Sequence, residues 1–452
     1  IVARGERDGE LWSIDNMTLD AGDVSLRAAG ELALGADNAS GLFRFRGSIA
    51  DLSNVGTIDG RLMHQQGMSW DAVISSSDGE LRMNDVTLTI GDSEISGSLL
   101  YKSGDVPEFD IELLSDSFEL APFLEERISV PEEPVSVPDS EQPQSNGRLI
   151  PDIAVPFEAM KKLNATLRVR LGELRRGDLT LFDAYLNADL RGGRLDVHDA
   201  GFRGRSGTLV SHATVDPSQG AGKVSFDVVA KDVMLGTTNV NLNPEMIWSS
   251  TINIDAAGND LRTLLGNADG VVFFDIRGAR TDNTKRANLL YGDLLGELIG
   301  ALKPTKETSS FTDFDCIITP AKIDNGTVTL EPNAFVQTDK LRVAAKSKIN
   351  LGTERLDVAI QTTPRRGVGI SAGQLINPFI KITGTLAKPR LSIDEQGVIF
   401  KGGAAVATGG LSLVATGLWD RIKRSDDACG ESAKAGRELL HDRLPTRLTD
   451  NQ

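Results

Sequence analysis

The residues in this chain whose types and spacing best suit chemistry are Asp313, Asp315 and Cys316. Two carboxylates and a thiol at neighbouring positions are groups that bind metal ions. Alternate acidic positions at the start of a strand are, however, more typical of a solvated face. The four histidines are scattered without partners at the spacing of metal ligands or of a catalytic triad. The sequence therefore predicts no metal site and no cofactor.

Motifs of the common enzyme classes are absent from the sequence. It contains no G-x-S-x-G elbow, P-loop, dinucleotide fingerprint or H-E-x-x-H. Gly367-Val368-Gly369 lacks both the remaining glycine and a preceding βαβ pattern. The two cysteines, Cys316 and Cys429, lie far apart and indicate no disulfide framework. We therefore expect a protein without catalytic residues, which is not an enzyme.

Composition excludes one class of partner. The chain has 452 residues and a formal net charge of −16, whereas binding to nucleic acid phosphates requires a basic surface. Hydrophobic residues make up 40% of the chain and aromatic residues only 5%, so its apolar surfaces are built from aliphatic side chains. Its 46 glycines separate short alternating runs, which is typical of many turns.

The stretch Phe311–Thr363 shows most clearly which elements position the apolar side chains. Its central run places apolar or small residues at every second position: Leu341, Val343, Ala345, Ser347, Ile349 and Leu351. The intervening residues are Arg342, Ala344, Lys346, Lys348 and Asn350. Successive side chains of a strand point to opposite faces, so this pattern predicts a meander with one apolar and one solvated face. Asp324-Asn325-Gly326 and Leu351–Glu354 are its predicted turns, because their residues suit reversals of the chain.

Similar patterns recur along the chain. Leu163–Leu171 alternates most regularly, and related phrases of strand, turn and strand occur at Glu80–Tyr101, Gly193–Val215 and Lys322–Asn350. Such repetition favours a stack of supersecondary units. We therefore predict a mainly β protein, an elongated, antiparallel and strongly twisted sheet of repeated meanders with a few short helices. Separate β-sandwiches are an alternative with the same alternation.

The sequence suggests four regions. Residues 1–124 form an N-terminal β segment, 125–155 an acidic, proline-rich linker or loop, and 156–400 a C-terminal β segment. Within residues 156–400, apolar residues that recur every three or four positions predict an amphipathic helix near 284–302, which is either a lid over the sheet end or part of the core. Residues 401–452 form a small-residue apolar helix and a charged tail. The uncharged run 402–419 reaches the lower length limit for a membrane span, and we interpret it as a plug that lies on a membrane or closes the sheet.

Several phrases of the C-terminal half match those of one known family. They are Leu261–Ile276, with a short helix, a glycine and a strand; Phe311–Leu330, with T-D-F-D and D-N-G-T-V; Lys346–Ile360; I-T-G-T-L-A-K-P-R-L at Ile382–Leu391; and the small-residue run Gly403–Leu418. With these phrases, the chain resembles the AsmA-like proteins of Gram-negative bacteria over about residues 163–430.

The resemblance implies a function. AsmA-like proteins are periplasmic, are anchored to the inner membrane by an N-terminal helix that this sequence lacks, and form taco-shaped β-grooves. It implies phospholipid as the ligand, transferred between inner and outer membranes, with membranes at one or both ends. The alternative is a scaffold or regulator of outer-membrane protein assembly and of protein targeting to membranes, with assembly proteins as partners. It implies no catalytic residues.

Candidate lipid contacts follow from the alternation. A groove would place apolar side chains against acyl chains, and each sheltered methylene contributes up to about 0.8 kcal/mol. The predicted inward-facing residues are Leu167, Val169, Leu171, Val343, Ile349, Val358 and Ile360. A closed core would have the same pattern, so the two alternatives remain open.

Overall fold

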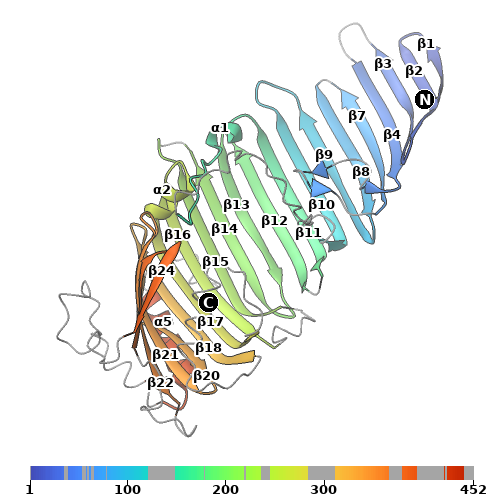
Figure 1. The fold of residues 1–452 in the computed structure, drawn as a ribbon. Helices are drawn as coiled ribbons and strands as arrows, with labels where there is room; N and C mark the ends of the chain where they lie inside the picture. Colours follow the sequence, from blue (N-terminus) through green and yellow to red (C-terminus); the bar gives the residue numbers. More distant parts are fainter. Residues whose placement is uncertain are drawn as a thin grey trace, which may run out of the picture. The chain divides into compact units, whose positions relative to one another are not determined.

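The fold is mainly β, as predicted. The computed structural model describes residues 2–34, 39–52, 57–58, 61–62, 66–77, 79–120, 148–177, 179–217, 220–235, 245–282, 311–365, 379–393, 422 and 425–441 (Figure 1). A sheet of 22 strands, mostly antiparallel, dominates these residues, beside a two-stranded hairpin of β5 (Thr57–Ile58) and β6 (Arg61–Leu62). Three helices accompany the sheet in the described part of the chain.

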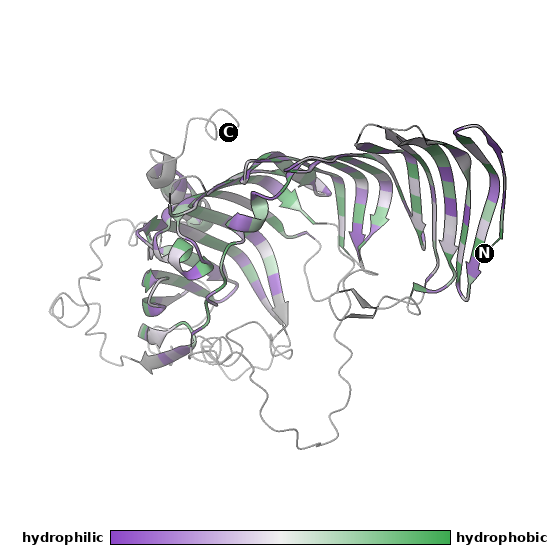
Figure 2. Cartoon of the chain, turned by 90° about the horizontal axis from the view of Figure 1, so that it is seen from above, coloured by the Kyte–Doolittle hydropathy of each residue, from purple (hydrophilic) through white to green (hydrophobic). Residues whose placement is uncertain are grey.

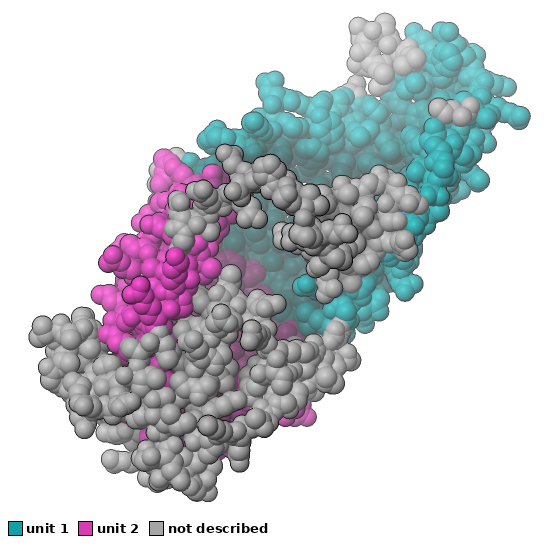
Figure 3. Space-filling model, in the orientation of Figure 1, with its two compact units in different colours: residues 1–142, 156–205, 212–217 teal, residues 143–155, 206–211, 218–452 magenta. Residues whose placement is uncertain are grey.

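The chain divides into two compact units (Figure 3). Unit 1 comprises residues 1–142, 156–205 and 212–217, and unit 2 comprises 143–155, 206–211 and 218–452. The strand β14 (Ser206–Asp216) contributes residues to both units. Each unit is described by itself below.

Unit 1 is a meander in which strands that follow one another in sequence also pair. Its strands are β1 (Val2–Asp8), β2 (Leu11–Ala21), β3 (Val24–Leu34), β4 (Ala39–Ile49), β7 (Met68–Ser77), β8 (Glu80–Ile90), β9 (Ser93–Lys102), β10 (Glu108–Glu119), β11 (Asn164–Arg176), β12 (Leu179–Arg191) and β13 (Arg194–Arg203). The pair β10–β11 is parallel, whereas the other pairs of this row are antiparallel.

The parallel pair accounts for the long connection between β10 and β11. A parallel pair requires a crossover, because the chain must return to the end where the first strand began. The crossover contains α1 (Phe157–Met160) and the predicted acidic linker, of which residues 125–147 lie outside the described residues. The strands before and after this segment are therefore neighbours in one unit.

Aspartates in strand interiors bend the sheet. Asp85 and Asp183 have φ values of 50° and 49°, and both lie at register shifts in β8 and β12. Asp232 in unit 2 has φ 46° and lies at a similar shift. Bulges of this kind increase local twist, and aspartate tolerates positive φ better than most residues. These three aspartates therefore mark bulges inside strands rather than turns between them.

Unit 2 continues the same construction. Its strands are β15 (Lys223–Met234), β16 (Ile247–Ala257), β17 (Asp269–Asp282), β18 (Phe311–Asp324), β19 (Thr327–Leu330), β20 (Ala334–Thr338), β21 (Leu341–Asn350), β22 (Arg355–Pro364), β23 (Phe379–Thr385) and β24 (Lys388–Ile393). Two short strands, β19 and β20, pair with different parts of β18 on one side and of β21 on the other. The helix α2 (Leu261–Gly266) follows β16 and is capped by Asp260, whose carboxylate accepts a hydrogen bond from the Thr263 amide at 2.8 Å.

Part of the predicted linker is held by unit 2. The amides of Leu149 and Ile150 donate hydrogen bonds of 2.7 and 2.9 Å to the Glu354 carboxylate, which is 1% exposed. Arg262 donates to the Ile150 carbonyl at 2.9 Å. Glu354 itself has φ 58°, in the turn predicted at Leu351–Glu354. Residues 148–155 are thus a bound segment at this point rather than a free linker.

The C-terminal helix differs from the prediction. The sequence predicted a charged tail here, but α5 spans Ala428–His441 and packs against β17, β18 and β20. Ala428, Cys429 and Ala433 lie on its buried side, so small residues make this part of the contact. The first part of the predicted solvated face of β21 is buried, with Arg342 7% exposed and Ala344 also buried, whereas Lys348 further along the same face is exposed as predicted.

Two predicted elements, the helix at 284–302 and the run 402–419, lie outside the described residues. Within the described ranges, no helix combines the length and apolar character needed to cross a membrane.

Candidate functional site

One face of unit 1 carries a continuous row of apolar side chains. Residues paired directly across strands share a face, so the row can be followed through the register from β2 to β13. It runs through Ile14, Gly30, Phe43, Ile74, Met83, Leu99, Ile111, Leu167, Ala188 and Val197. A neighbouring row contains Leu113, Val169, Leu186 and Ala200. Figure 2 shows the corresponding alternation of hydrophobic and hydrophilic bands along the strands.

These side chains are only partly shielded from solvent. Leu167, Val169 and Leu171 are half-buried, whereas Arg168 and Arg170 between them are exposed. The alternation predicted for this strand is therefore confirmed, and the strand extends from Asn164 to Arg176. An ordinary core would bury aliphatic side chains almost completely. The face retains apolar surface that a further apolar group can cover.

The reverse face of unit 1 is polar and ion-paired. Arg168 meets Asp110 at 2.8 Å, and Asp71 binds both Arg44 and Arg46. These two guanidinium groups hold the pKa of Asp71 below its usual value. Exposed pairs of this kind contribute little to stability, and their main effect is to keep this face hydrated.

A depression of about 620 Å³ lies in unit 1 and is lined by Arg170, Tyr185 and Asp199 among others. Burial, with a smaller contribution from Asp199, raises the pKa of Tyr185. Asn187 donates to Asp199 at 2.6 Å, and Asp183 pairs with Arg203 at 2.8 Å. Asn187, Asp199 and Asp183 are thus engaged with protein partners, and we build no site on this depression.

The four candidate residues of unit 2 lie together in a packed cluster. Val343 and Ile360 are buried, and the half-buried Ile349 and Val358 pack against the same cluster. The cluster also contains Leu356, Ile380 and Ile382 of β22 and β23. The structure thus brings Val343, Ile349, Val358 and Ile360 together, and separately places Leu167, Val169 and Leu171 on one strand of unit 1. Contact of lipid with either group stays a prediction.

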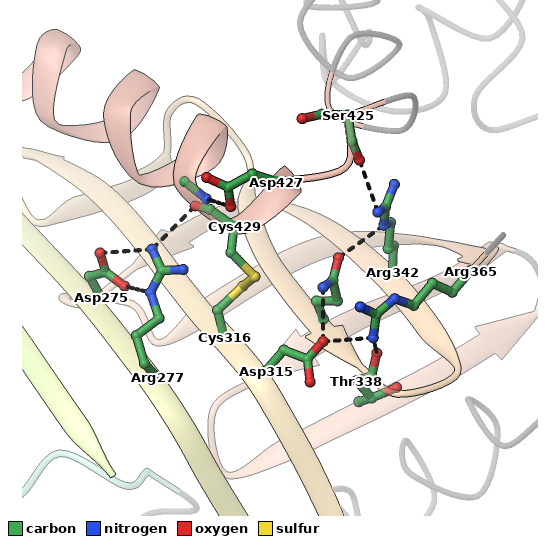
Figure 4. The surroundings of a disulfide bond; sticks show 12 residues. Asp275, Arg277, Asp315, Cys316, Thr338, Arg342, Arg365, Ser425, Asp427 and Cys429 are labelled. Atoms are coloured by element: carbon green, nitrogen blue, oxygen red, sulfur yellow. Dashed lines mark hydrogen bonds and ion pairs between the residues drawn. A yellow bond between two sulfur atoms is a disulfide. The ribbon is translucent and has the colours of Figure 1, made fainter. Parts of the chain in front are cut away.

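The opposite face of the unit 2 sheet holds a disulfide that sequence reasoning missed. Cys316 of β18 is bonded to Cys429 of α5, 113 residues away (Figure 4). The bond lies in a buried cluster with Phe273, Ile318 and Phe335. The available signal was the number of cysteines, because two cysteines allow only one intramolecular pair.

Charged groups around the disulfide hold α5 on the sheet. The buried Asp275 binds Arg277 and also Arg437 of α5, the latter at 2.8 Å. Arg277 also donates to the Cys429 carbonyl at 3.3 Å, and the buried Arg342 donates to the Ser425 carbonyl at 3.0 Å. Figure 4 shows Arg277 reaching the Cys429 carbonyl in α5 and Arg342 reaching the Ser425 carbonyl just before it. Guanidinium groups suit this role because each has several donors in a fixed plane.

The carboxylates considered as metal ligands have other partners. Asp313 binds Arg280 at 2.6 Å, and Asp315 binds Arg365 at 2.7 Å and accepts from Gln337 at 2.9 Å. Among the residues that the structure describes, no group of three or more potential ligands could hold a metal ion.

No family model, curated protein or solved structure matches this chain. The apolar face of unit 1 and the disulfide-linked helix of unit 2 are therefore the two features from which its function can be argued.

Proposed function

We propose that the chain is a non-enzymatic, AsmA-like lipid-transfer protein of the periplasm. The apolar face of unit 1 shelters the acyl chains of phospholipids that pass between the inner and outer membranes, while headgroups lie outside the apolar rows. The observation that carries the proposal is the row of apolar residues across ten strands, which, apart from the buried Ala188, are half-buried rather than packed into a core. The resemblance of the C-terminal half to AsmA-like proteins supports the same function.

The energetics of such a face are favourable. A methylene that is fully sheltered from water contributes roughly 0.8 kcal/mol, so half-sheltering contributes roughly 0.4 kcal/mol. An acyl chain of about 15 methylenes would then gain roughly 6 kcal/mol on the face. That gain holds a lipid out of water yet allows it to move along the row, because each position offers a similar aliphatic surface.

The disulfide supports the proposed location. Disulfides form and persist in oxidising compartments such as the bacterial periplasm and are rare in the cytosol. Cys316 and Cys429 are paired and buried. A transfer protein of this kind has phospholipid as its ligand and a membrane at one or both ends as its partner.

The test is the lipid content of the full chain purified after export to a bacterial periplasm. Leu113 and Leu114 are neighbours on β10, but Leu113 pairs with Val169 on the apolar face and Leu114 pairs with Arg170 on the reverse face. We expect Leu113→Asp and Val169→Asp each to lower the phospholipid found by mass spectrometry at least tenfold. Leu114→Asp introduces the same charge at a position 39% exposed and should leave the lipid content unchanged.

Two results would contradict the proposal. One is wild-type protein with a β-sheet circular dichroism spectrum and no phospholipid. The other is an equal loss of lipid in Leu113→Asp and Leu114→Asp, because a general loss of folding would explain both.

The alternative is a scaffold for outer-membrane protein assembly, in which a strand of another protein would pair with β1, the first strand of the described residues. All seven residues of Val2–Asp8 are exposed, and β1 pairs with β2 along one side. An exposed edge can accept a strand from another protein, although charges such as Arg4 and Glu6 oppose it. Crosslinking from β1 during outer-membrane protein export should trap unfolded protein if the scaffold function holds, and lipid transfer predicts no such product.

A further inference from the structure

Two buried polar atoms in unit 1 have no hydrogen-bond partner. Among the described residues of this unit, they are the Ser117 hydroxyl oxygen and Arg175 Nε. They lie on adjacent strands: Ser117 of β10 pairs with Glu173 of β11, and Arg175 pairs with Glu119. The register of this pair is constant along its length, so Ser117 and Arg175 are diagonal neighbours on one face.

That face is the apolar one. Leu171 and Val169 precede Arg175 at intervals of two residues along β11, and Leu113 precedes Ser117 by four along β10. Residues at such intervals on a strand point the same way. The unpartnered atoms therefore lie where the apolar rows end, towards the C-terminal ends of β10 and β11.

The missing partners require an explanation. A buried donor without an acceptor is unfavourable, and native proteins pair nearly all of them. Ser115, two residues before Ser117 on the same face, is paired in the expected way and donates to the Glu94 carbonyl at 2.6 Å. A hydroxyl and a guanidinium Nε that lack acceptors at diagonally neighbouring positions suit an oxyanion, and the planar guanidinium fork matches phosphate oxygens.

We propose that Ser117 and Arg175 form the subsite for the phosphodiester headgroup of a phospholipid whose acyl chains lie along the apolar rows. This inference rests on the proposed lipid-transfer function and adds to it the class of headgroup and its location. Glu173 lies directly opposite Ser117 and Glu119 lies directly opposite Arg175, both on the same face. Their carboxylates repel additional negative charge and attract a cation, so the subsite suits a zwitterionic headgroup such as phosphoethanolamine.

The experiment measures competitive loading of the full chain with lipids of identical acyl chains. The lipids are phosphatidylethanolamine, phosphatidylglycerol and diacylglycerol, and mass spectrometry gives the bound ratios. We expect wild-type protein to favour phosphatidylethanolamine over diacylglycerol at least tenfold. Arg175→Gln should remove most of this preference, and Ser117→Ala should lower it several-fold, while diacylglycerol loading stays unchanged.

Matched controls come from neighbouring residues. Arg176 follows Arg175 on the same strand but is exposed and points to the reverse face, so Arg176→Gln makes the same change in charge and should keep the preference. Ser115→Ala removes a hydroxyl that is already paired and should also keep it.

Several outcomes would overturn the inference. If Arg175→Gln and Arg176→Gln show the same preference for phosphatidylethanolamine over diacylglycerol, the subsite is refuted. If the wild type still binds lipid in that case, the transfer function is not affected. A preference for phosphatidylglycerol would refute the zwitterionic headgroup. Inorganic phosphate bound by the lipid-free chain as tightly as the phospholipid would assign the site to free phosphate. Absence of any lipid would refute the transfer function itself and the subsite with it.

Discussion

Reduction of the Cys316–Cys429 disulfide is expected to destabilise unit 2. The bond joins β18 to α5 and closes a loop of 113 residues. Closing a loop removes conformational freedom mainly from the unfolded chain, and the effect grows with the logarithm of loop length. For this separation the loss corresponds to about 5 kcal/mol at 25 °C, or a change of 10³ to 10⁴ in the unfolding equilibrium.

After reduction, non-covalent contacts hold α5 on the sheet. Arg437 still binds Asp275, and Arg342 still donates to the Ser425 carbonyl. Buried Ala428 and Ala433 are small, so they bury little apolar area per residue. We therefore expect α5 to be the first element of unit 2 to open in the reduced protein.

The assay is urea unfolding of the full chain with and without dithiothreitol, combined with hydrogen exchange of the α5 amides. The expected result is a lower unfolding midpoint for unit 2 and faster exchange in α5 after reduction. The double variant Cys316→Ala, Cys429→Ala is the control, because dithiothreitol should not change its midpoint. If thiol titration shows both cysteines reduced and the unfolding free energy falls by less than about 1 kcal/mol, the reasoning from loop closure is wrong.

Two further predictions concern single side chains of unit 2. Glu354→Ala leaves the amides of Leu149 and Ile150 without an acceptor. We therefore expect the free energy of unfolding in urea to fall by roughly 2–4 kcal/mol and a protease to cleave the chain near residue 149. Arg355→Ala should change neither the unfolding free energy nor the cleavage. Burial lowers the pKa of Lys346, opposed in part by Glu331. The folded state therefore disfavours charged Lys346, and this penalty is present at neutral pH and disappears as pH rises above the unfolded value of 10.5. Lys346→Met should stabilise the protein at pH 7 and lose that advantage near pH 11. Equal gains at both pH values, or the same gain for the exposed Lys348→Met, would contradict the assignment to burial.

Local patterns predicted the strands well. Alternation at Leu167, Val169 and Leu171 placed β11 and its apolar face correctly, because side-chain direction along a strand depends only on position. The turn at Asn325-Gly326 was also predictable, and both residues have positive φ, 43° and 64°. These features depend on residues that are neighbours in sequence.

Contacts between distant segments were not predictable in the same way. A side chain at Gly326 would meet the carbonyl oxygen of Gly266 at 2.3 Å, so this glycine is needed for packing as well as for the turn. Nothing near Gly326 in the sequence indicates that contact. The same holds for Glu354, whose buried carboxylate binds a segment about 200 residues earlier in the chain.

By itself, the sequence determined which residues form strands, which face of each strand is apolar and where several turns occur, because these follow from period two and local backbone preferences. Only the tertiary structure decided what covers each face. In unit 1 the apolar side chains stay half-buried, with Ser117 and Arg175 unpartnered at the end of their rows. In unit 2, Arg342 and Ala344 lie on the face predicted to be solvated but are buried, where a disulfide and arginines hold α5 on the sheet. The physical reason is that alternation specifies two faces for a strand, whereas their burial depends on segments far away in the chain.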